Sequence, residues 1–171
     1  MCPGGEVFAA ASEQGGVCTN GMSNSRRDGE NANAAVLVTL RPEDFPDKRT
    51  LGGMYWQREI EEAAYRLTGS YRAPAQRVGD LLRGVPTPNS LTHRSTYQPN
   101  VIFGDLRETL PNYVTDTLAQ ALPALDKKLH GFAAPDALLV GVETRSSSPV
   151  RILRNAETCE SAVRGLFPAG E

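Results

Sequence analysis

Residues 105–131, DLRETLPNYVTDTLAQALPALDKKLHG, carry the longest periodic pattern of the chain. Five apolar side chains recur in it at helical spacing: Val114, Leu118, Leu122, Leu125 and Leu129. The spacing predicts a helix that Pro111 can start and that Gly131, a natural terminator, closes. Pro123 lies inside the pattern and should kink or split the helix, because proline cannot donate the hydrogen bond that a helix interior requires.

Two further helices are expected upstream of this one. The first buries a face formed by Trp56, Ile60, Ala63 and Leu67. Gly69 would close that helix. Pro74 suits the first turn of the next helix, which would end before Gly84. Its inward side chains would be Val78, Leu81 and Leu82.

Strand-like runs flank this helical region on both sides. Residues 6–12 and 17–19 surround a polar turn and predict a hairpin, and residues 34–40 predict a buried strand. After the helices, residues 137–142, 150–153 and 163–167 are the next strand-like runs. We therefore expect an α+β fold in a single domain over residues 1–171, strand-rich at 1–40 and 137–171 and helical over 52–130. The terminal strands would pair with each other or with a sheet outside this chain.

Composition excludes several classes of function. Of the 171 residues, 40% are hydrophobic and 22% charged, as in ordinary globular proteins, and this length can bury a core. The net charge of −2 offers no basic surface for nucleic acid or an anionic membrane, and no apolar run approaches the roughly 20 residues of a spanning helix. Cys2, Cys18 and Cys159 form no C-x-x-C pair, and only two histidines accompany them, so we expect no metal site and a reduced, cytoplasmic setting.

Common catalytic signatures are missing from the chain. It contains no G-x-G-x-x-G after a first strand, no P-loop, no H-E-x-x-H and no G-x-S-x-G. Its two histidines, His93 and His130, lie in polar segments, and we interpret both as exposed polar residues. The chain therefore has no dinucleotide-binding fingerprint of its own.

One polar segment, residues 141–152, is the best candidate for a ligand-binding site. It concentrates Glu143, Arg145 and several hydroxyl groups between two strand-like runs. A guanidinium offers a fork of donors to an anion, and hydroxyl groups adapt to either donors or acceptors. The alternative is an Arg–Glu pair and serines that stabilise a tight turn. From the residues alone the structural alternative is favoured, and Arg26 and Arg27 are open to the same two interpretations.

Six motifs in sequence order support a resemblance to a known family. They are CPGG at 2–5, TNGMS at 19–23, RDG at 27–29 with NAN at 31–33, APAQ at 73–76, GVETR at 141–145 with SSPVRI at 147–152, and GL at 165–166 with PAGE at 168–171. Together they resemble the C-terminal half of bacterial FAD-dependent dehydrogenases that are known only as uncharacterised flavoproteins. The resemblance covers essentially the whole chain.

The resemblance implies a cofactor and a set of site residues. In the family an N-terminal part holds the FAD pyrophosphate, and a Gly-rich tail follows the PAGE motif. Five residues of this chain would then lie at the flavin: Cys2, Gly4, Gly5, Gly170 and Glu171. Arg145 would contact an anionic substrate or the cofactor, with Glu143 as its orienting partner, and both would face the same cleft as the CPGG turn. Tight turns alone remain an equally good explanation of the glycines.

These observations predict that the chain functions as part of a larger protein. Both ends of the chain look cut from a larger protein, so we expect an insert and C-terminal domain of an FAD-dependent oxidoreductase that transfers hydride or electrons to or from a small-molecule substrate. Its partner would be the missing FAD-binding domain, and the piece alone would neither retain FAD nor be active. The alternative is a stand-alone ligand-binding or protein-interaction module without redox activity.

Overall fold

The computed structural model describes residues 2–89 and 94–170, and it has the α+β organisation that the sequence predicts. Two compact units can be distinguished in it. The first comprises residues up to 39 together with 58–144, and the second comprises 40–57 together with the residues from 145 onwards. Each unit is described by itself.

The first unit begins with a hairpin and a short strand pair. β2 (Gly5–Ala9) and β3 (Thr19–Ser23) are antiparallel, with Gly5 opposite Ser23, and β1 (Cys2–Pro3) pairs with β4 (Ala32–Asn33). The hairpin that the sequence predicts is confirmed, but its connection is longer than expected and spans residues 10–18.

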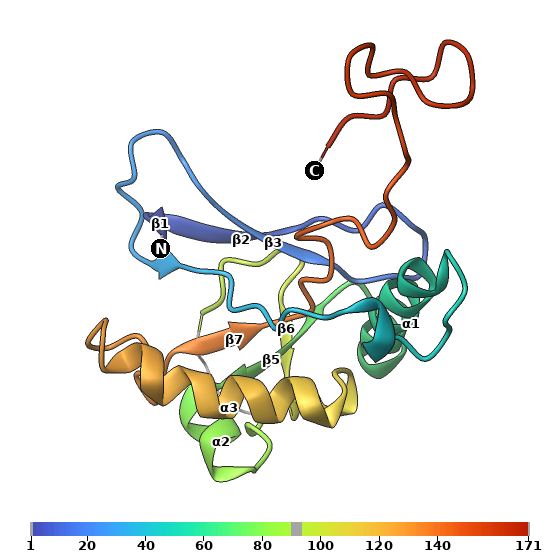
Figure 1. Ribbon diagram of the computed structural model, residues 1–171. Coiled ribbons are helices and arrows are strands. Elements are labelled where there is room, and N and C mark those ends of the chain that lie inside the picture. The colour runs from blue at the N-terminus through green and yellow to red at the C-terminus, as the bar shows by residue number, and fades with distance from the viewer. Residues whose placement is uncertain (1, 90–93, 171) are drawn as a thin grey trace. The chain divides into compact units, whose positions relative to one another are not determined.

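A three-stranded sheet lies at the centre of the first unit. Its middle strand, β5 (Ala73–Arg77), runs parallel to β6 (Val101–Phe103) and antiparallel to β7 (Leu138–Val140). β5 is short and almost wholly buried, and α2 (Val78–Arg83) follows it directly and begins the crossover to β6. Figure 1 shows β5 between its two neighbours.

The predicted long helix is confirmed as α3 (Asn112–Asp126), which follows the short 3₁₀ turn η2 (Leu106–Glu108). It ends earlier than predicted, with Lys127 as C-cap, so Gly131 does not close it and Leu129 is exposed. Its buried residues pack with α2 in a cluster of Val78, Leu81, Leu118 and Leu122. Figure 1 shows α3 alongside α2 at the sheet. Pro111 precedes the first turn as the N-cap. Pro123 lies in the last turn of the helix and does not split it.

The helix predicted before Gly69 is also confirmed, as α1 (Gly52–Thr68), of which residues 58–68 belong to the first unit. Gly69 closes it with a φ of 62°, and its amide donates to the Tyr65 carbonyl at 2.8 Å. The buried face differs from the predicted one: Leu67 is exposed. In the first unit that face consists of Ile60, Glu61, Ala64 and Thr68.

Several predicted elements are wrong. Pro74 lies in β5 and starts no helix, and Leu82 is exposed on α2. Residues 34–40 form no strand, and Val36 and Val38 pack against the α2–α3 cluster.

The predicted C-terminal strands are absent as well. Residues 150–153 and 163–167 form no strand, and the described N-terminal strand β1 pairs with β4. Residues 163–166 turn back on themselves, with the Leu166 amide donating to the Val163 carbonyl at 3.1 Å, and such a turn is incompatible with an extended strand.

The second unit contains η1 (Pro42–Asp44), the first turns of α1 and the C-terminal segment. Phe45 and Trp56 pack with ring centroids 5.8 Å apart, and Phe45 and Pro149 crowd Gly53 so closely that a Cβ there would lie within 3 Å of both. The C-terminal segment exposes five large apolar side chains: Ile152, Leu153, Val163, Leu166 and Phe167. Within the described residues of the whole chain, no helix is long and apolar enough to cross a membrane.

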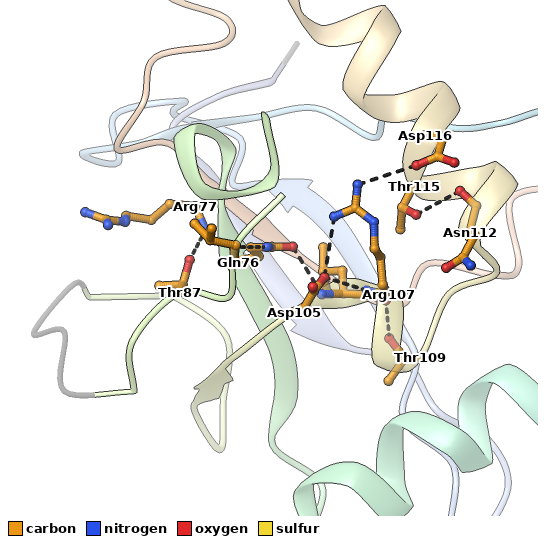
Figure 2. Close-up of polar contacts among 11 residues, drawn as sticks. Gln76, Arg77, Thr87, Asp105, Arg107, Thr109, Asn112, Thr115 and Asp116 are labelled. Carbon is orange, nitrogen blue, oxygen red and sulfur yellow. Dashed lines mark hydrogen bonds and ion pairs between the residues drawn. The ribbon is translucent and has the colours of Figure 1, made fainter. Parts of the chain in front are cut away.

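A buried polar cluster fastens the sheet of the first unit to its connecting loops. Gln76 is fully buried, donates to the Val85 carbonyl at 2.8 Å and accepts from the Leu106 amide at 3.1 Å. Thr87 Oγ1 accepts from the Arg77 amide at 2.9 Å (Figure 2). These contacts satisfy groups whose burial without a partner would be costly.

Asp80 is the charged member of this cluster and is 2% exposed. Its carboxylate accepts four hydrogen bonds, from Arg77 Nε at 2.7 Å and Nη2 at 3.2 Å, from Thr87 Oγ1 at 2.6 Å and from Arg83 Nη2 at 2.5 Å. The hydrogen bond from Arg77 and those from Thr87 and Arg83 outweigh the opposing effect of burial and lower the pKa of Asp80 to about 2. Asp80 is therefore charged in the folded protein down to low pH.

Replacing Asp80 by asparagine should lower the free energy of unfolding by about 2 kcal/mol at neutral pH, because the guanidinium groups lose a charged acceptor. Since folding lowers this pKa, the stabilisation is complete above the ordinary pKa of aspartate and is lost as the pH falls from about 4 to about 2. Urea unfolding of the wild type and of Asp80→Asn between pH 2 and 7 measures both effects.

Asp116→Asn is the matched control, because the Asp116 side chain is 58% exposed and its ion pair with Arg107 is long, at 3.4 Å. It should change the stability by less than about 0.5 kcal/mol. Equal losses in the two variants would contradict the role assigned to the Asp80 cluster.

Candidate functional site

The candidate site is built on residues 141–144, which follow the last strand of the central sheet. Val142 is 1% exposed, and its carbonyl accepts from the amide of Thr19 at 2.9 Å. The segment is thereby held against the start of β3. Glu143 and Thr144 come next and are half-buried.

Thr144 is fixed through its side chain. Its hydroxyl donates to Glu61 Oε1 at 2.5 Å and lies 3.7 Å from the Cys18 sulfur. Glu61 and Cys18 are buried, on α1 and in the connection before β3. Three parts of the first unit, the hairpin, α1 and the segment after β7, therefore meet at the Thr144 hydroxyl group.

Glu143 lies between these two anchored neighbours. Burial raises the pKa of its carboxyl group above the ordinary range, because desolvation disfavours the charged form. A half-buried carboxyl group with a raised pKa can exchange a proton with a ligand nearer to neutral pH than an exposed one can. Glu143 is thus equipped for hydrogen bonding or proton transfer at this site.

The other candidate residues from the end of the chain belong to the second unit. Arg145 is its first residue after Thr144, so its pairing with Glu143 and its position relative to the CPGG turn stay predictions. Gly170 has a φ of 122° and an open surrounding, because a Cβ built on it would meet nothing within 4 Å. Glu171 and His93 lie outside the described residues, and His130 is exposed.

The CPGG turn has a structural explanation of its own. Gly4 is buried with a φ of 65°, and a Cβ there would lie 2.5 Å from the carbonyl carbon of Arg27. A Cβ on Gly5 would lie 2.6 Å from the Asn33 side chain. The space beside both glycines is thus filled by residues 27–33 of the same chain, and a flavin contact by Gly4 or Gly5 stays a prediction. Cys2 is exposed, and all three cysteines are free.

Sequence reasoning missed two polar residues that shape this region. Asn33 donates through Nδ2 to the carbonyls of Glu6 at 2.7 Å and Met22 at 3.1 Å, and it thereby fastens β4 to the hairpin. Glu61 was overlooked because the helical pattern was read from apolar residues alone. The available signal was the position of Glu61 three residues before Ala64, which places the two residues on the same helix face.

The arrangement in the first unit defines a class of site: a polar segment at the end of a central sheet, braced by buried polar groups. A comparison with protein families assigns the chain to one of them. The model of the family described as "FAD-dependent protein, C-terminal domain-like" matches residues 1–146, and the chain belongs to this family.

A curated relative extends the match to the remaining residues. An "Uncharacterized protein" of Clostridium beijerinckii (strain ATCC 51743 / NCIMB 8052) is 45% identical over 172 residues, which cover 100% of this chain. They make up 32% of the relative, so the chain spans about a third of the length of the relative that it matches. Similarity therefore continues through residues 147–171, beyond the family model.

The close packing at Gly4 can be tested by substitution. Gly4→Ala should lower the free energy of unfolding by more than about 2 kcal/mol, because it adds both an unfavourable φ and a clash with backbone atoms. Gly15→Ala is the control: its φ is 77°, but a Cβ there meets nothing within 4 Å, so only the backbone cost of about 1 kcal/mol applies. Urea unfolding of both variants gives the two values, and equal losses would show that residues 27–29 do not confine Gly4.

Proposed function

We propose that this chain is part of an FAD-dependent oxidoreductase, a dehydrogenase that transfers hydride or electrons to or from a small-molecule substrate. The observation that carries the proposal is the family match over residues 1–146, the region that contains the whole first unit and the candidate site. FAD would supply the redox chemistry, and this chain would supply groups that bind and orient its ligands.

Residues 141–145 are the proposed ligand-binding segment. The segment is anchored at the Val142 carbonyl and the Thr144 hydroxyl group, so Glu143 projects from a fixed support. Glu143 would hydrogen-bond the ligand or exchange a proton with it, and Arg145 would bind an anionic group of the substrate or cofactor. Such a division of roles suits a polar substrate with at least one negative charge.

The fit of this chain to FAD is partial. Gly170 has the open surroundings that a close approach of the flavin requires, whereas the space beside Gly4 and Gly5 is occupied by the chain itself. The pyrophosphate of a dinucleotide is bound at a Gly-rich turn before a helix N-terminus, and the sequence contains no such motif. Most of the affinity for FAD would therefore come from a separate FAD-binding domain, the proposed partner.

The proposal includes a location. The three cysteines are free, and Cys18 is buried among polar groups of the candidate site. A cytoplasmic setting, where thiols stay reduced, suits this use of cysteine. We propose no nucleic-acid or membrane partner, since the net charge of −2 provides no basic surface for either.

The isolated chain should not retain FAD. The contacts that residues 2–5 and 141–170 can offer to a flavin would also have to offset the entropy of ordering the ligand and the loops. The chain is purified, its visible spectrum is recorded, and FAD is titrated with fluorescence detection. We expect a colourless protein without saturable binding at micromolar FAD. A yellow protein with stoichiometric flavin, or submicromolar binding, would show that the cofactor site has been misplaced.

A chimera tests whether this chain supports FAD binding when it is part of a full-length protein. In the chimera this chain replaces the matching 172 residues of the Clostridium relative, and the unaltered relative is the control. Both should bind FAD and show a flavin spectrum. If the unaltered relative binds no flavin, the proposed function is wrong. If only the chimera fails, this chain has lost the contacts that the relative makes.

A further inference from the structure

We propose that Glu61 is a positioning residue: through the Thr144 hydroxyl group it holds the backbone of residues 142–144 and thereby fixes the direction in which Glu143 projects. The role of Glu143 toward a ligand rests on the proposed function. The positioning itself is a property of this chain and can be tested without any cofactor.

Glu61 and Thr144 are in direct contact. Glu61 is 2% exposed, and its Oε1 accepts a hydrogen bond from Thr144 Oγ1 at 2.5 Å. The two residues are 83 positions apart in the sequence. The Glu61 side chain therefore links α1 directly to the segment after β7.

The backbone of Glu61 also holds the segment that leads into β3. The Glu61 carbonyl accepts from the Val17 amide at 3.0 Å, and two residues later the Thr19 amide donates to the Val142 carbonyl at 2.9 Å. The segment 17–19 is thereby fastened on one side to α1 and on the other to residue 142. Glu61 and Thr144 close this ring of contacts.

The ring leaves Glu143 little backbone freedom. The residue before it is held through its carbonyl and the residue after it through its side chain, so the Cα–Cβ direction of Glu143 is set from both sides. A side chain on a rigid backbone loses less conformational entropy when it binds a ligand. The half-buried environment of the Glu143 carboxyl group also depends on this placement.

Four variants test the contact between Glu61 and Thr144. Thr144→Val removes the hydroxyl group at nearly constant shape, and Thr144→Ser retains it. Glu61→Gln replaces the carboxyl group by an amide of the same shape, and Glu61→Ala removes the acceptor.

The test uses the chain itself, with two readouts. Hydrogen–deuterium exchange follows the amides of residues 19 and 141–145, and carbon-detected NMR titration follows the Glu143 carboxyl group. In Thr144→Val and Glu61→Ala, exchange of these amides should rise by about tenfold, and the raised pKa of Glu143 should move back toward its ordinary value. Thr144→Ser should retain both properties, and Glu61→Gln should be intermediate.

The exchange of amides near Asp80, in the polar cluster at β5 and α2, is the internal control and should stay unchanged in all four variants. If Thr144→Val leaves the exchange of residues 141–145 and the Glu143 titration as in the wild type, the proposal is overturned. If Glu61→Ala does not fold, the comparison of Thr144→Val with Thr144→Ser still decides it. Because no flavin is used, failure of the proposed function would leave these results unaffected.

Discussion

The first unit depends on two backbone hydrogen bonds that flank the buried residue Cys18. The Val17 amide donates to α1 and the Thr19 amide donates to the segment after β7. They connect the hairpin to α1 on one side and to the segment after the central sheet on the other. Since both bonds are buried, breaking either would leave polar groups without partners, at a cost of about 1–3 kcal/mol each.

The contacts at this junction also restrain the candidate site. A strand end is usually a flexible place, but here Val142 and Thr144 are each tied to a different element. In the described part of the second unit, the C-terminal segment exposes the large apolar side chains Leu153, Val163 and Phe167.

The sequence predicted those elements whose periodicity coincides with their packing. The helix around Leu118 and Leu122 was found because its apolar face meets α2, and Gly69 and Gly84 end helices as predicted because both adopt a positive φ. The α+β class follows from the same patterns.

The failures have equally specific causes. Val36 and Val38 alternate like a strand but pack on helices, and Pro74 was read as a helix start although it lies in a buried strand. For the site, the sequence singled out Glu143 and Arg145 but overlooked Glu61, because no local pattern reveals a contact across 83 residues. The family was recognised from ordered motifs, and it is confirmed over residues 1–146.

We propose that residues 141–145 belong to a ligand site and are more than a braced turn. The most direct measurement is a crystal structure of the flavin-loaded chimera with the Clostridium relative, solved with and without a candidate anionic substrate. We expect the carboxyl group of Glu143 and the guanidinium of Arg145 to face the cavity that holds the flavin and its substrate. A structure in which both side chains contact only protein, with the flavin bound elsewhere, would contradict the account.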